Sequence, residues 1–192
     1  SMPFVKKVEN HTSLLTPKLS FRLNPSDMKD YSSSSNKINV NNAFALNRLG
    51  LSDTLETGKS ITLGLDYKNE KKNDLDQINN YFELKLATVL RDKEEKFIPN
   101  KSTIHKKNSN LFGSITNKFS NNLDLGYNFS LDNDYSTFEY NDLNATLSIN
   151  NFITKFNFIE EHGDTGDTNV MASSFEYNID KKNSFKFQTR RN

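Results

Sequence analysis

The chain has 192 residues, a formal net charge of +1 and no cysteine, so it forms no disulfide and its bulk charge does not suggest a nucleic-acid binder. Only 34% of its residues are hydrophobic, against about 45–50% in a typical soluble domain, and no run approaches the roughly 20 apolar residues of a membrane helix. A barrel with a wet interior needs an apolar side chain only at every second position, so this fold class accounts for the apolar deficit.

The first quarter of the chain is expected to hold two strands and a long connection. Residues 1–13 are polar and are expected to be an irregular lead-in to a domain over residues 14–192. Apolar and polar residues alternate at 19–23, which predicts a first strand. Residues 24–38 are rich in serine and asparagine and are expected to form a connection before a second strand at 40–46.

The next stretch, residues 47–67, pairs a polar turn with a strand of strict alternation. On one side of this strand are Ile61, Leu63, Leu65 and Tyr67, and on the other are Ser60, Thr62, Gly64 and Asp66. Successive side chains of a strand point to opposite faces, so one face is apolar and the other polar. Such a strand fits a β-sandwich or an outer-membrane barrel, and the strand alone does not decide between them.

The rest of the chain reads as a meander in which short and longer connections alternate. A polar connection at 69–76 follows the strand expected at 59–67. Further strands are expected at 82–90, 111–118, 122–131, 137–149, 152–160, 169–179 and 184–190, with tight turns at 120–121, 150–151 and 180–183. The apolar parity changes within 137–149, which predicts a β-bulge near Asn141 and Asp142. The predicted fold is therefore all-β, an antiparallel up-and-down meander of about ten strands that forms part of a large outer-membrane β-barrel and is incomplete at both ends.

No enzyme constellation is apparent in the sequence, and no cofactor is expected. His11, His105 and His162 fall in predicted loops and lack the spacing of metal ligands. The acidic, glycine-containing residues 163–167 could hold calcium, but they are too short for a known calcium loop, and a plain turn is preferred. The sequence therefore predicts a protein that binds or transports rather than an enzyme.

Three stretches in order resemble the LptD family of lipopolysaccharide-assembly outer-membrane proteins, also called OstA or Imp. The first is Leu15-Thr16-Pro17-Lys18 with Arg22 and Pro25; the second is Asn42-Ala43-Phe44-Ala45-Leu46-Asn47-Arg48-Leu49 with Asp53, Glu56, Gly58, Gly64 and Leu65; the third is Tyr127-Asn128-Phe129-Ser130-Leu131-Asp132. The chain departs from the family pattern at Leu49, where phenylalanine is usual, and at Leu51-Ser52, where glycine and tyrosine are usual. It also lacks the disulfide-forming cysteines of some members.

The resemblance implies a translocon in the outer membrane of a Gram-negative bacterium, surrounded by outer-membrane lipid. In that family lipopolysaccharide arrives from a periplasmic transport bridge, its sugars pass through the lumen, and its acyl chains enter the outer leaflet through a lateral opening. The family's barrel is plugged by a lipoprotein, LptE. An exported protein needs a signal peptide, and none is visible at residues 1–10, so we expect this chain to be a segment of a longer protein.

Two sets of polar residues are candidates for binding. In the turn, Arg48 beside acidic residues can form a bidentate pair that locks a strand junction, or the turn can contact lipopolysaccharide or the plug protein. This set is Asn47, Arg48, Asp53 and Glu56. The second set, expected to face the lumen with Lys18, is Arg22, Asp66, Glu83, Lys85 and Asp124; these side chains either touch a passing sugar or phosphate group or only hydrate the lumen. A passive porin or receptor barrel and a secreted β-sandwich binding module remain as alternative functions.

Overall fold

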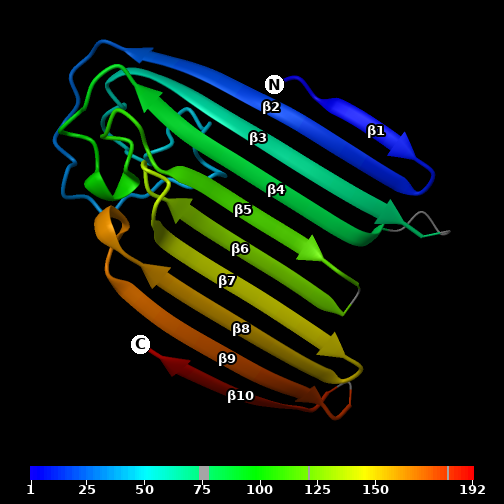
Figure 1. Ribbon diagram of the computed structural model, residues 1–192. Coiled ribbons are helices and arrows are strands. Elements are labelled where there is room, and N and C mark those ends of the chain that lie inside the picture. The colour runs from blue at the N-terminus through cyan, green and yellow to red at the C-terminus, as the bar shows by residue number, and fades with distance from the viewer. Residues whose placement is uncertain (74–77, 121, 181) are drawn as a thin grey trace.

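The computed structural model describes residues 1–73, 78–120, 122–180 and 182–192, and its strands form one antiparallel sheet in chain order (Figure 1). Within these residues the sheet has ten strands, and β1 and β10 are its two open edges. The strands are β1 (Phe4–Val8), β2 (His11–Asn24), β3 (Gly58–Lys72), β4 (Ile78–Arg91), β5 (Leu111–Lys118), β6 (Leu123–Leu131), β7 (Phe138–Ile149), β8 (Phe152–Glu161), β9 (Thr168–Asn178) and β10 (Ser184–Arg191). The expected all-β meander is confirmed.

The connections differ in length between the two ends of the sheet. At one end β1 joins β2 through residues 9–10, and β7 joins β8 through residues 150–151, with Asn150 at a φ of 51°. Asparagine tolerates this left-handed conformation, which a tight hairpin turn requires. At the other end lie residues 25–57 and 92–110, called here the inner loops, the latter with the 3-10 helix η1 (Asn100–Ser102). Short turns at one end and long loops at the other are the pattern of outer-membrane barrels.

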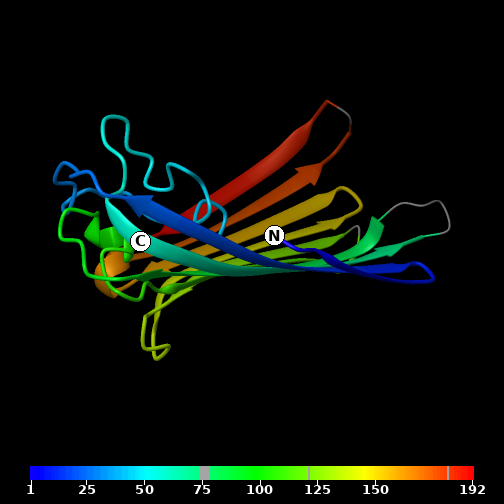
Figure 2. The same ribbon diagram turned by 90° about the horizontal axis from the view of Figure 1, so that it is seen from above.

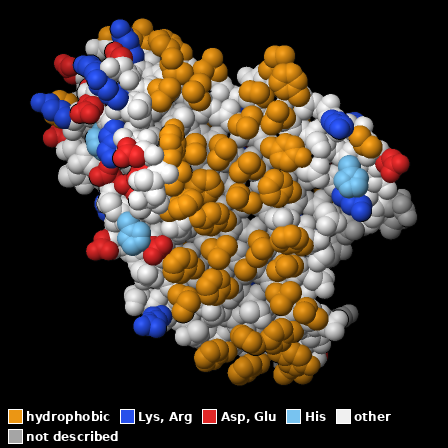
Figure 3. All heavy atoms as spheres, in the orientation of Figure 1, with side chains coloured by type: hydrophobic (Ala, Val, Ile, Leu, Met, Phe, Trp, Pro, Cys, Tyr) orange, Lys and Arg blue, Asp and Glu red, His pale blue; other side chains and the backbone are white. Residues whose placement is uncertain are grey.

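One face of the sheet is apolar because the register aligns the apolar positions of successive strands. A single row of mutually paired residues crosses nine strands: Phe4, Leu15, Tyr67, Leu84, Ile115, Tyr127, Leu143, Phe158 and Met171. Figure 3 shows this outer face, on which hydrophobic side chains cover much of the sheet. Large apolar side chains on it are open to the surroundings, as with Phe21 at 67% and Phe187 at 58% exposure.

The opposite, inner face is polar and concave, and both inner loops lie on it (Figure 2). The small core forms there, where apolar loop residues pack on inward side chains of β4 and β5. It consists of Met28, Ile38, Val40, Ala43, Leu49, Leu51, Ile98 and Ile104 from the loops and Ala87, Val89 and Phe112 from the strands. The hydrophobic core therefore lies between loop and sheet, and it covers only one part of the inner face. Among the described residues no helix is long and apolar enough to cross a membrane.

Two expectations about the first quarter of the chain are wrong. Residues 4–8 form strand β1, paired to β2, so residues 1–13 are not an irregular lead-in. Residues 40–46 are turns rather than a strand. Asparagine side chains divert this segment from a strand, since the amides of Asn41 and Asn42 donate to the Asn39 side chain, and the apolar residues fill the core instead.

The bulge in β7 lies at Glu139, two residues before the expected site. Ser130 pairs with Tyr140 while Leu131 pairs with Phe138, so Glu139 is the extra residue. A bulge exchanges the faces of the residues on its two sides, which places Phe138 outside and Tyr140 inside. Residues 69–72 of the predicted connection at 69–76 belong instead to β3. Residues 74–76 and parts of the predicted turns at 120–121 and 180–183 lie outside the described residues.

Candidate lumen site

The inner face carries a buried charge cluster centred on Glu56. Arg48 donates from Nε to one oxygen of the Glu56 carboxylate at 2.6 Å and from Nη2 to the other at 2.5 Å, a bidentate pair. Arg91, the last residue of β4, donates from Nη1 to Glu56 Oε1 at 2.5 Å, and Arg22 Nη1 lies 3.6 Å from Oε2. One carboxylate therefore faces three guanidinium groups.

The same arginines attach the first inner loop to the sheet. Arg48 donates to the hydroxyl of Thr62 at 2.8 Å and to that of Ser60 at 3.0 Å, both on β3. Arg22 of β2 donates to the carbonyl oxygens of Ala45 and Leu46, each at 2.7 Å. The polar side chains of alternate strand positions thus hold the loop on the inner face. We call Arg22, Arg48, Glu56 and Arg91 the arginine cluster.

Glu56 stays ionised because its partners overcome its burial. Burial alone would raise the pKa of this carboxyl, whose side chain is only 3% exposed. The hydrogen bond and charge of Arg48, with the charges of Arg91 and Arg22, outweigh burial and lower the pKa below its ordinary value. Removal of the carboxylate would leave buried cations without a counter-charge, so Glu56 is the residue on which the cluster depends.

The other two residues of the predicted turn set do not join the cluster. Asn47 closes its own turn, since its side-chain amide donates to the carbonyl of Leu51 at 2.7 Å and its side-chain oxygen accepts from the amide of Leu51 at 3.1 Å. Asp53 lies at the surface, where it accepts from Lys29 and from the Tyr31 hydroxyl, both at 2.6 Å. The hydrogen bonds from Lys29 and Tyr31 lower the pKa of Asp53. The turn therefore divides into a buried part and an exposed part.

The predicted lumen residues lie on the inner face, but they pair with one another. Lys18 of β2 forms an ion pair with Asp66 of β3 and lies 5.5 Å from the centre of the Phe44 ring. Lys85 and Glu83 on β4 pair at 3.0 Å. Asp124 is exposed near the short-turn end of β6, away from the inner loops. The inner face between the loops and the short turns therefore carries these two ion pairs, and Asp124 belongs to neither.

Arg91 was not identified from the sequence. It ends a predicted strand, and only the register that pairs it with Ser60 brings it to Glu56. The register of β3 against β4 is not encoded in the periodicity of either strand. The only sequence signal is a charged residue at the point where the alternation of residues 82–90 stops.

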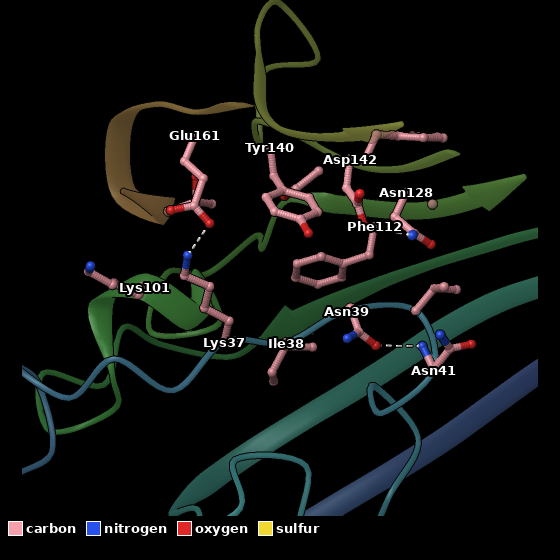
Figure 4. Close-up of a pocket in the computed structure, with 15 residues that line it drawn as sticks. Lys37, Ile38, Asn39, Asn41, Lys101, Phe112, Asn128, Tyr140, Asp142 and Glu161 are labelled. Carbon is pink, nitrogen blue, oxygen red and sulfur yellow. Dashed lines mark hydrogen bonds and ion pairs between the residues drawn. The ribbon is translucent and has the colours of Figure 1, made fainter. Parts of the chain in front are cut away.

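A pocket of about 260 Å³ lies beside the core, between the first inner loop and the inner face of β5 to β8 (Figure 4). Loop residues 37–41 form one wall, and Asn128, Tyr140 and Asp142 form part of the other. Lys37 of the loop forms an ion pair with Glu161 at the end of β8. This pocket is not predictable from the sequence, because its walls are far apart in the chain and part of the loop was expected to be a strand.

The acidic turn after β8 is occupied by protein contacts. The 3-10 helix η2 (Gly163–Thr165) lies here, and Asp164 pairs with Lys106 of the second inner loop at 2.5 Å. Thr165 donates from its hydroxyl to the carbonyl oxygen of His162 at 2.8 Å. Within the described ranges no group of three or more histidine, cysteine or acidic side chains is arranged to hold a metal ion.

Two comparisons with known proteins bear on this arrangement. The family model described as LptD, LPS transport system D, matches residues 1–187. The matched region therefore includes both inner loops, the arginine cluster, the pocket and every strand as far as Phe187 of β10. No curated protein matches the chain.

Proposed function

Because the chain belongs to the LptD family of lipopolysaccharide transport, whose members are outer-membrane proteins of Gram-negative bacteria, we propose that it forms part of the barrel wall along which lipopolysaccharide is assembled into the outer leaflet. One observation carries this proposal: a single sheet has an apolar face on one side and a polar, loop-filled face on the other. Such a sheet suits two solvents at once, hydrocarbon outside and water inside.

The two faces match the two halves of a lipopolysaccharide molecule. The outer face, with rows such as Tyr127, Leu143 and Phe158, would lie in lipid beside the acyl chains. The inner face, with the ion pairs of Lys18 with Asp66 and Lys85 with Glu83, would let hydrated sugars pass without burying unpaired charge. In this proposal the chain supplies a passage and a membrane wall, and it breaks no bond.

The strand ends give the wall an orientation. In outer-membrane barrels the long loops are extracellular and the short turns periplasmic. On this rule the inner loops close the outer end of the wall, and residues 9–10 and 150–151 face the periplasmic bridge that would deliver lipopolysaccharide. An LptE-like lipoprotein would fill the lumen on the part of the inner face that the loops leave open.

The arginine cluster and the predicted lumen residues take different parts in this proposal. Arg22, Arg48 and Glu56 hold the loop and have their charges satisfied within the protein, so they would act on transport by fixing the loop. Asp66, Glu83, Lys85 and Asp124 lie along the open inner face, where they would contact a passing sugar or phosphate. Asn47 and Asp53 shape the loop surface.

The alternatives are weaker on specific grounds. A β-sandwich module needs a second sheet to cover the apolar face, and the described strands form one sheet. A passive porin or receptor barrel would share the alternation, but the family match favours lipopolysaccharide transport.

Depletion of the protein in the bacterium that carries it tests the proposal. Newly made lipopolysaccharide should then disappear from the cell surface and accumulate at the inner membrane, as measured by surface labelling and membrane fractionation. Unchanged surface labelling, with general permeability to small solutes lost instead, would favour the porin alternative.

A further inference from the structure

A second hollow, of about 450 Å³, lies on the concave inner face of strands β7 to β10 (Figure 2), and no described residue of the inner loops lines it. It forms because the inward side chains of β9 are small here, whereas those beside them on β8 and β10 are long. Strand pairing aligns the inward residues in two neighbouring rows: Asn144, Asn157, Ala172 and Arg190, and Thr146, Lys155, Ser174 and Gln188. These two rows define what we call the β9 hollow.

The β9 hollow holds two exposed cations on its opposite sides. Lys155 comes from β8 and Arg190 from β10, so two strand spacings, roughly 10 Å, separate their backbones. Both side chains are long enough to turn toward one group held between them, over Ala172 and Ser174. Among the described residues the Lys155 side chain has no ion pair or hydrogen bond, and the bond from Arg190 Nε to Asn192 at 3.0 Å leaves both Nη groups free.

The register explains why these two cations lack a counter-charge. The inner-face lysines beside the hollow each lie opposite a carboxylate, Lys118 opposite Asp124 and Lys186 opposite Glu176. The two cations of the hollow instead lie opposite uncharged residues. They are therefore the cations on this part of the sheet to which no facing carboxylate belongs.

The charges around the hollow do not cancel. Toward the inner loops lies Asp142, whose carboxylate accepts from Asn144 and Asn157 at 2.8 and 3.2 Å. Asp142 pairs with Ile159, four residues along β8 from Lys155, which is roughly 13 Å and more than the Debye length of about 8 Å at physiological ionic strength. The two cations of the hollow and the two neighbouring lysines thus face three carboxylates, and the excess positive charge lies in the hollow itself.

Uncharged donors complete the lining. The side chains of Thr146, Ser174 and Gln188 form no hydrogen bond with any described residue, so their hydroxyl and amide groups can serve a ligand. A guanidinium fork, an ammonium point charge and hydroxyl donors together match a phosphate group, which carries about two negative charges and several acceptor oxygens. At about 450 Å³ the hollow falls within the roughly 300–1,000 Å³ of small-molecule sites, so it has room for a sugar unit beside a phosphate.

We propose that the β9 hollow binds one phosphorylated sugar unit, with its phosphate between Lys155 and Arg190 and its sugar hydroxyls against Thr146, Ser174 and Gln188. The inference rests on the proposed passage of sugars along the inner face, and it adds a place where a phosphate on such a sugar is recognised. Because both cations are exposed, a bound phosphate stays partly hydrated and each pairing contributes little. Weak binding of this kind suits a ligand that is passed along rather than retained.

The test is saturation-transfer NMR on the full chain in micelles of an uncharged detergent, with glucose-6-phosphate, glucose and inorganic phosphate as probes. Glucose-6-phosphate should bind measurably, and glucose at least several-fold more weakly, since glucose leaves the two cations unpaired. Inorganic phosphate should displace glucose-6-phosphate only in several-fold excess, because it has no sugar hydroxyls. Raising the salt from about 0.1 to about 1 M should weaken binding of glucose-6-phosphate, since the Debye length falls from about 10 to about 3 Å.

Five variants separate the proposal from nonspecific binding. Lys155→Gln and Arg190→Gln should each weaken binding of glucose-6-phosphate several-fold, and the double variant should reduce it to the level of glucose. Ser174→Leu keeps both cations but fills the floor of the hollow, and it should weaken both sugars. Lys118→Gln removes an inner-face lysine outside the hollow; it is the matched control and should leave binding unchanged. Circular dichroism of each variant shows whether the sheet has formed.

Several results would overturn the proposal: no signal from glucose-6-phosphate, equal binding of glucose, equal binding of inorganic phosphate, or losses in Lys118→Gln as large as those in Lys155→Gln. Equal binding of inorganic phosphate would reduce the hollow to an anion site that recognises no sugar. The binding assay does not depend on transport. Sugar-phosphate binding with intact export after depletion would leave the hollow standing and remove the proposed function, whereas lost export without such binding would do the reverse.

Discussion

Replacing Glu56 by alanine should release the first inner loop from the sheet while leaving the sheet formed. The substitution removes the acceptor of the bidentate bond from Arg48 and of the bond from Arg91, and it leaves three guanidinium groups without their counter-charge. Loss of one partner of a buried ion pair typically costs about 3–5 kcal/mol. The 3% exposure of the Glu56 side chain makes the buried value the appropriate one.

Hydrogen exchange measures this release directly. At about 1.4 kcal/mol per factor of ten, amides of the loop should exchange roughly two to four orders of magnitude faster in the variant. Suitable reporters are the amides of Ala43 and Gly50, which donate to loop carbonyls at 3.0 and 3.2 Å. The amides that pair β7 with β8 lie away from the loop attachment and should keep their rates.

Asp53→Ala is the matched control, since it removes a carboxylate from the same loop. Its ion pair with Lys29 is exposed, with 40% of the Asp53 side chain and 66% of the Lys29 side chain open to solvent, so its loss should change loop exchange far less than the loss of Glu56. The reasoning would be refuted if Glu56→Ala accelerated loop exchange no more than Asp53→Ala, or if both loop and sheet amides accelerated equally.

Three further predictions concern the pH dependence of the loop, a close contact on the sheet and the lipid-facing surface. Because the folded-state pKa of Glu56 is lowered, the stabilisation that its carboxylate provides is complete above the ordinary glutamate pKa of about 4.3 and is lost as pH falls through the lowered value. Protection of the loop amides, corrected for intrinsic exchange rates, should therefore hold from pH 7 to 5 and decline below about 4. The Glu56→Ala variant should not show this decline. Gly113→Ala should lower the free energy of unfolding in urea, measured in micelles, by about 1–3 kcal/mol, since the new Cβ would lie 2.1 Å from the Phe129 ring. In a Phe129→Leu background the same substitution should cost less. An unchanged cost in that background would contradict the proposed clash with the Phe129 ring. Leu143→Lys on the outer face should cost about 2–4 kcal/mol when the chain is folded into lipid vesicles, whereas Asn144→Lys on the inner face should cost far less, and equal costs would argue against a lipid-facing outer surface.

Strands β2 to β10 were predictable because each carries its own alternation of apolar and polar residues, whereas β1 was missed. The expected strand at 111–118 and the structure's β5 agree at both ends, and the expected strand at 152–160 differs from β8 by one residue. Alternation is a local signal, and a strand with one apolar face needs no distant residue to be recognised. The bulge was also visible as a change of parity, but its position was not, because Glu139 is identified as the extra residue only by its partners on β6.

The site was less predictable because it forms between distant segments. Residues 40–46 contain apolar side chains that suggested a strand, and only the fold shows that they pack into a core with Phe112. The pairing of Arg48 with Glu56 was an available hypothesis, since eight residues separate them in one turn. The third partner, Arg91, and the pocket beside Tyr140 depend on the register of β3 to β8, which sequence periodicity does not specify.

The alternation of solvents across β6 tests the central claim most directly. The chain has no cysteine, so single cysteines can be placed along residues 123–129 and spin-labelled in lipid vesicles without background. The account predicts a period of two: labels at Leu123, Leu125, Tyr127 and Phe129 should collide with oxygen dissolved in lipid, and labels at Asp124, Gly126 and Asn128 with a water-soluble nickel complex. Equal accessibility to both reagents along the strand, or oxygen accessibility on the inner face, would contradict a wall between lipid and a wet lumen.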